Sequence, residues 1–251
     1  NTGLNTPRQR AAWLLLALAA LTVLLTALGA SVGSTGFDSV LRLADDPMAA
    51  RIVWDIRLPR SLGAWLAGAL LGLSGAVAQG LFRNPLAEPF LLGSASGASL
   101  GVAAALALFG AAPATAWLAK LGLTGAAFVG AVVAVLLTLQ LARGVQHTLR
   151  LLLAGVIVGV VLGAIKDLIT LASPDIIAAM QGFNLGSAGF IGWASCVLML
   201  LAWCVCMAGA WVFSRALDGL SLGEATAVSL GLPLVPMRVA LVAVLALSTG
   251  T

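Results

Sequence analysis

The chain has 251 residues, of which 61% are hydrophobic and 9% are charged, and its formal net charge is +4. Soluble domains have about 45–50% apolar and about 25% charged residues, so this composition excludes an ordinary soluble fold. The charges lie between apolar runs rather than on one face, which argues against a nucleic-acid binder. The chain has a single histidine, and its three cysteines all lie in one apolar run, so the sequence predicts no metal site.

In chain order, the apolar runs predict an all-α, polytopic transmembrane helix bundle, because a helix needs about 20 apolar residues to cross a bilayer. The first run is too long for the apolar part of a signal peptide, so we interpret it as a span. The sequence stops inside an apolar run, so we expect further C-terminal helices. The predicted spans are 11–30, 61–81, 94–112, 121–142, 151–172, 191–213 and a seventh that opens near Val239.

Basic residues outnumber acidic ones on one set of connections. That set comprises the N-terminus, the turn at Arg83, the region 143–150 and the segment 215–238. Since positive charge is retained on the cytoplasmic side, we expect these segments to be cytoplasmic.

Before the second span, Arg57 and Arg60 flank Pro59. Arginines three residues apart share a face if the segment is helical. They either point the same way at the start of a helix or flank a turn. Anchoring at the membrane interface through phosphate contacts is the alternative interpretation.

The turn from Arg83 to Gly93 contains Pro85 and Pro89, which break a helix. We expect Asn84 to cap the following helix. Irregular backbone and charge at membrane depth require surrounding protein or a water-filled cavity. The turn therefore indicates either a functional interior or simply a well-capped helical hairpin.

The fifth span carries Gly155, Gly159 and Gly163, followed by Lys166 and Asp167. Small residues at four-residue spacing favour close helix packing, and we expect Asp167 to continue that protein-facing row. Each intramembrane charge costs about 2.5–3.5 kcal/mol on insertion scales. The pair indicates either a polar lining for a substrate path or a lysine that extends to the interface beside a carboxylate.

The segment 215–238 is too polar and too interrupted to span a membrane. Ser221 and Glu224 have the spacing of a capping box, which predicts a short helix. A short helix pair there is a docking platform for another protein, and an ordinary long loop is the alternative. The sequence contains no phosphate-binding loop, so this chain is not expected to hold ATP.

Together these segments resemble the FecCD family, the membrane permeases of bacterial ABC importers for iron-siderophores, haem and cobalamin. The resemblance covers most of the chain, and one departure is Met180–Asn184 where the family often has a tryptophan. The motif residues are Arg57, Pro59, Arg60, Gln79, Asn84, Pro85, Glu88, Pro89 and Gly93, and the resemblance resumes at 152–156, 185–187, 220–227 and 230–231.

The resemblance implies a single permease domain over 1–251, truncated from a ten-helix, type II ABC importer permease of the bacterial inner membrane. It implies a second permease subunit (a homodimer or a paired homologue), two cytoplasmic ATPase subunits that hold ATP and magnesium, and a periplasmic binding protein. The chain itself would bind no cofactor. The ATPase-coupling residues would be Leu220, Ser221, Leu222, Gly223, Glu224, Ala227, Leu230 and Gly231, and the substrate path would include Gly155, Gly159, Gly163, Lys166 and Asp167.

The function expected from this resemblance is ATP-driven import of an iron chelate, either a siderophore or haem, by alternating access. Cobalamin import is the alternative. A proton-coupled secondary transporter would need a relay of intramembrane acids, and only Asp167 qualifies. An intramembrane enzyme would need clustered catalytic groups within the spans, so the chain is expected to be non-catalytic.

Overall fold

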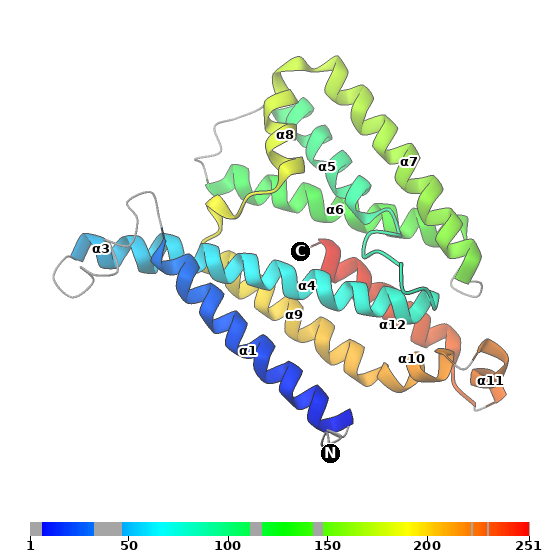
Figure 1. Cartoon of the computed structure of the whole chain (residues 1–251). Helices are drawn as coiled ribbons and strands as arrows, with labels where there is room; N and C mark the ends of the chain where they lie inside the picture. Colours follow the sequence, from blue (N-terminus) through cyan, green and yellow to red (C-terminus); the bar gives the residue numbers. More distant parts are fainter. Residues whose placement is uncertain are drawn as a thin grey trace. The chain divides into compact units, whose positions relative to one another are not determined.

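The computed structural model describes residues 7–32, 47–110, 117–142, 148–221, 223–229 and 231–250, and every regular element among them is helical (Figure 1). A π-helical segment, Ile52–Arg57, joins α3 to α4, and short 3₁₀ turns occur at Pro174–Ile176 and Ala188–Phe190. The α-helices are α1 (Pro7–Ser31), α3 (Pro47–Arg51), α4 (Leu58–Phe82), α5 (Ser94–Phe109), α6 (Trp117–Leu141), α7 (Thr148–Ala172), α8 (Ile177–Leu185), α9 (Trp193–Val212), α10 (Ser214–Ser221), α11 (Glu224–Ser229) and α12 (Leu234–Gly250).

The predicted helical membrane bundle is confirmed. Five helical stretches in the described residues are long and apolar enough to cross a membrane: Arg8–Ser31, Pro47–Phe82, Gly122–Leu141, Leu149–Ala172 and Trp193–Val212. The predicted third and seventh spans form shorter apolar helices, Ser94–Phe109 and Leu234–Gly250. At about 1.5 Å per residue, a helix of the length of Ser94–Phe109 reaches less far than the hydrocarbon core is thick.

The seventh helix begins earlier than predicted. It starts at Leu234, so the last residues of the segment 215–238 belong to α12, and Arg238 is buried rather than part of a charged loop. Pro236 is compatible with this start, because the backbone N–H groups of a first helical turn have no intrahelical partner to lose.

The chain divides into two compact units, Asn1–Gly68 with Ala188–Met199, and Ala69–Ser187 with Leu200–Thr251. In the first unit, the π-helical segment ends just before Pro59, and Leu58 N–H donates to the carbonyl of Val53. A proline ring clashes with the carbonyl four residues earlier, so a wider helical turn accommodates Pro59 within a continuous helix.

Polar groups of the first unit are satisfied across its helices. The side chain of Arg57 is buried and its Nη1 donates to the carbonyl of Ser31, at the end of α1, at 3.0 Å. Trp193 Nε1 donates to the carbonyl of Trp54 at 3.1 Å, and their rings lie 5.4 Å apart. Arg57 is therefore buried against the end of α1, whereas Arg60 is exposed.

In the second unit, α5, α6 and α7 pack together, α8 lies against α5 and α7, and α12 against α5 and α6. The α5–α6 crossing is close because a Cβ atom on Gly97 would collide with the carbonyl of Gly130, and one on Gly101 with that of Ala126. Small residues therefore allow the backbones of α5 and α6 to approach closely. On α4, by contrast, nothing lies within 4 Å of a Cβ added at Gly68 or Gly72.

Candidate functional site

The turn between α4 and α5 is an ordered structure. Arg83 (φ 50°) is the one non-glycine residue with positive φ in the described part of the chain. Asn84 N–H donates to the carbonyl of Gln79 at 3.2 Å. This is the bond of a Schellman motif, which satisfies a carbonyl at the end of α4, and Pro85 then prevents the helix from continuing. The turn begins as a helix cap rather than as a loose loop.

The prediction that Asn84 caps the following helix is wrong, because Asn84 caps its own turn. Its Oδ1 accepts a hydrogen bond from Leu86 N–H at 3.0 Å, and its carbonyl accepts one from Ala87 N–H at 3.0 Å. The residue that precedes α5 is Gly93, with φ 76°. An asparagine side chain reaches a backbone N–H two residues on, so it is too far from a helix that starts at Ser94.

The far end of the turn lies directly on α7. A Cβ atom on Gly155 would collide with the carbonyl oxygen of Leu91, and one on Gly93 would lie 3.3 Å from the backbone nitrogen of Gly159. The hydroxyl of Thr138, on α6, donates to the carbonyl of Leu92 at 3.0 Å and is fully buried. The turn is therefore held between two helices. Sequence reasoning missed Thr138, although a hydroxyl within an apolar run is a signal for such a contact.

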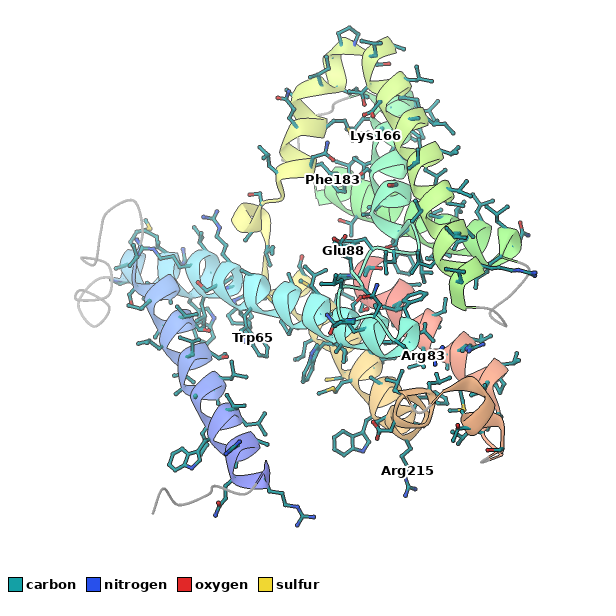
Figure 2. All side chains as sticks on the ribbon, turned by 45° about the vertical axis from the view of Figure 1, so that its right-hand side comes forward. Trp65, Arg83, Glu88, Lys166, Phe183 and Arg215 are labelled. Carbon is teal, nitrogen blue, oxygen red and sulfur yellow. The ribbon has the colours of Figure 1, made fainter. Side chains whose placement is uncertain are left out.

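The remaining motif residues of the turn lie nearer the surface. Glu88 and Gln79 are exposed. A Cβ atom added at Gly75 of α4 would lie 3.8 Å from the ring of Pro89, so Pro89 packs beside this glycine. Figure 2 shows Arg83 at the end of α4 and Glu88 in the turn that follows.

The glycine row of α7 is only partly covered. The turn backbone lies over Gly155 and Gly159, whereas nothing lies within 4 Å of a Cβ added at Gly163. The proposed role of this glycine row in lining a substrate path stays a prediction. The open part of the row begins at Gly163.

Lys166 and Asp167 form an ion pair, with Nζ 2.6 Å from Oδ1. The prediction that Asp167 continues the protein-facing row was wrong: its side chain is 73% exposed, against 19% for Lys166. Four residues turn a helix by about 400°, so a four-residue row drifts about 40° at each step. By Asp167 the row that starts at Gly155 has rotated off the packed face of α7 and lies among exposed leucines.

The segment predicted to dock a partner forms two short helices, α10 and α11. Leu220 of α10 and Ala227 of α11 are buried in one apolar cluster with Leu81 of α4 and Leu241 of α12. A Cβ atom on Gly80 would lie 3.1 Å from the side chain of Leu217. The helix pair is therefore packed against the ends of two longer helices.

Two glycines set the ends of α11. Gly223 (φ 109°) precedes it, and Gly231 (φ 74°) follows it. Leu232 N–H donates to the carbonyl of Ala227 at 3.2 Å, which is again the Schellman bond, here with glycine in the left-handed position. Both glycines were predicted to contact an ATPase, and that role stays a prediction.

The predicted capping box is wrong, because α10 extends through Ser221 and α11 starts only at Glu224. Ser221 therefore cannot occupy the N-cap position of α11, which Gly223 holds. Leu222 and Leu230 lie outside the described residues, as do the side chains of Ser221 and Glu224. The contact of this segment with an ATPase stays a prediction.

Comparison with known proteins places these elements in a family. The model of the FecCD transport family matches residues 3–251. The vitamin B12 import system permease protein BtuC of Shigella boydii serotype 18 is 39% identical over 244 residues, which cover 94% of this chain and 70% of that protein. BtuC of Escherichia coli O1:K1 is 41% identical over 203 residues, 78% of this chain and 59% of that protein.

A solved structure, described as an inward-facing conformation of a metal-chelate type ABC transporter, has the same fold. Its TM-score is 0.80 at 25% identity, over 95% of this chain and 73% of that one. The two BtuC alignments span 59–70% of those proteins' length. The family match, the two BtuC relatives and the shared fold agree: this chain is a multi-pass inner-membrane protein that belongs to the FecCD transport family.

Proposed function

We propose that this chain is the membrane-spanning permease of an ATP-driven importer and moves a bulky metal chelate inward by alternating access. One observation carries the proposal. The short helix pair α10–α11 is anchored by Leu220 and Ala227 in the cluster that also contains α4 and α12 residues. A force applied to this pair would be transmitted to two long helices.

The proposed source of that force is a pair of cytoplasmic ATPase subunits that carry ATP and magnesium. Glu224 and its neighbours would make the contact. Gly223 and Gly231 have positive φ at the two ends of α11, a backbone conformation that glycine adopts without steric cost. A periplasmic binding protein would deliver the cargo, and a second permease subunit would complete the path.

Two classes of cargo are supported by different observations. Relatives named as vitamin B12 permeases favour a corrinoid, and the structural neighbour favours metal chelates in general, which include iron chelates. The pair Lys166–Asp167 adds a physical argument. Lys166 is neutralised by its neighbour and the exposed group is the carboxylate, so a path at this point would attract an anionic iron chelate less than a neutral corrinoid.

The experiment is co-purification of the full-length permease with its cognate ATPase, with ATP hydrolysis measured as a function of added binding protein. Glu224→Lys should abolish stable ATPase association. Asp175→Lys is the matched control, because Asp175 is an exposed acid of the α7–α8 connection, on the side predicted to be outer. Equal ATPase association in the Glu224→Lys variant and the unmodified protein would overturn the assignment of the α10–α11 pair.

A further inference from the structure

The α4–α5 turn is braced by its own hydrogen bonds from one end to the other. After the Schellman bond that ends α4, Asn84 accepts hydrogen bonds from two later backbone N–H groups of the turn. Leu91 N–H then donates to the carbonyl of Glu88 at 3.4 Å, and the next such bond, from Gly93 N–H to the carbonyl of Phe90, measures 2.9 Å. Successive hydrogen-bonded turns fix the backbone dihedral angles, so this segment can move as one body.

The first half of the turn lies in the apolar cluster that anchors the α10–α11 pair. Leu81 at the end of α4 is buried in that cluster, as are Ala87 and Leu92 of the turn. Leu220 of α10 and Ala227 of α11 belong to the same cluster. A close-packed interior is hardly compressible and transmits displacement, so a shift of the α10–α11 pair also displaces the turn.

The second half of the turn meets α7 backbone against backbone. A Cβ atom on Gly155 would collide with the carbonyl oxygen of Leu91 and would lie 3.1 Å from the Cα atom of Leu92. Where two backbones touch, no change of side-chain rotamer can absorb a displacement. Movement of the turn therefore reaches α7 directly.

A single side chain from α6 holds the turn in this position. The hydroxyl of Thr138 is fully buried and donates to the carbonyl of Leu92 at 3.0 Å. Leu92 is 2% exposed, so water cannot replace this donor. Loss of the hydroxyl would leave a buried carbonyl unpaired, which favours a turn that has shifted away from α7.

We propose that the α4–α5 turn carries movement between the α10–α11 pair and α7, and that Thr138 is the positioning residue that holds the turn against α7. This inference rests on the proposed function, because the movement originates in the ATPase. It adds the element that connects the docking pair with the helix proposed to line the substrate path. All of these contacts lie within the second compact unit.

The test uses the complex of the full-length permease with its cognate ATPase and measures how strongly the binding protein stimulates ATP hydrolysis. Thr138→Val replaces the hydroxyl with a methyl group of similar size. We expect unchanged ATPase association, because the α10–α11 pair is untouched, and stimulation at least about fivefold lower, the lower end of typical coupling between two sites. Thr138→Ser keeps the hydroxyl and should retain the stimulation.

Val102→Ala is the matched control for lost stability. Val102 is as deeply buried as Thr138, but it belongs to a second cluster with Ile176 and Met180. Within the described part of the chain, that cluster contains no residue of the turn or of α10 and α11. This variant should retain the stimulation.

Stimulation in Thr138→Val equal to that of the unmodified complex would overturn the inference and leave the proposed function standing. Equal losses in Thr138→Val and Val102→Ala would also overturn it, because they would show a general effect of stability. An unmodified permease that binds no ATPase would contradict the proposed function and this inference together.

Asn84→Ala decides the matter if Thr138→Val fails to fold. Asn84 is partly exposed, and its replacement removes only the bond from Leu86 N–H that braces the turn. Reduced stimulation in this variant supports the link, and unchanged stimulation overturns it.

Discussion

The contact between the α4–α5 turn and α7 allows a matched pair of substitutions. Gly155→Ala and Gly163→Ala place the same methyl group on the same helix, two turns apart. At Gly155 the new Cβ would collide with the Leu91 carbonyl oxygen and lie 3.0 Å from its carbonyl carbon. At Gly163 nothing lies within 4 Å. Only the first substitution should force the turn away from α7.

The magnitudes separate the two variants. Alanine is favoured over glycine in a helix by about 0.8–1.0 kcal/mol, and both variants gain this contribution. An overpacked contact costs about 1–3 kcal/mol, and only Gly155→Ala incurs it. Gly163→Ala should therefore be neutral to stabilising, and Gly155→Ala should unfold at a free energy about 1–3 kcal/mol below that of Gly163→Ala.

The assay is unfolding of the purified protein in lipid nanodiscs or mild detergent, measured for both variants under the same conditions. Cargo uptake measured alongside reports whether displacing the turn also impairs transport. If the two variants had equal stability, the close approach of Leu91 to α7 would be wrong, and with it the account of the α4–α5 turn as a fixed element of the bundle.

Three further predictions follow from other contacts. Leu220→Ala empties a buried position beneath the α10–α11 pair at a cost of about 2–5 kcal/mol, and should raise the ATP hydrolysed per cargo molecule transported; an unchanged ratio contradicts the anchoring role. Arg57→Gln loses a charge-assisted hydrogen bond to the Ser31 carbonyl worth about 1.5–3 kcal/mol and should lower the midpoint of thermal unfolding. An unchanged midpoint would show that this hydrogen bond makes no net contribution to stability. Lys166→Leu leaves the Asp167 carboxylate without its neighbouring cation, so uptake of an anionic chelate should fall more than uptake of a neutral one. An equal change in the uptake of both chelates would favour the interpretation of Lys166 as an interface anchor only.

Much of the fold was predictable because apolar run length reports directly on membrane crossing. The helical class, six of the seven span positions to within a few residues, and the short α10–α11 pair follow from composition and from glycine and proline placement. Close packing at Gly155 follows from the four-residue spacing of small residues on α7.

The errors have three different causes: local turn geometry, a tertiary contact and the drift of a row along a helix. Asn84 was assigned to the following helix, but the turn is long enough that its side chain serves the turn itself. The sequence around Arg57 is typical of a surface charge, and only the tertiary structure shows that Arg57 donates a hydrogen bond to the Ser31 carbonyl at the end of α1. Asp167 was placed by a four-residue rule that holds for one or two steps and then drifts off the packed face.

We propose that this permease transports cargo only when a separate ATPase acts on it. The most direct measurement is uptake of a radiolabelled corrinoid or iron chelate into vesicles that contain the full-length permease, with the ATPase, the binding protein and ATP each omitted in turn. We expect uptake only with all three present. Uptake driven by a pH gradient in vesicles without the ATPase would contradict the account.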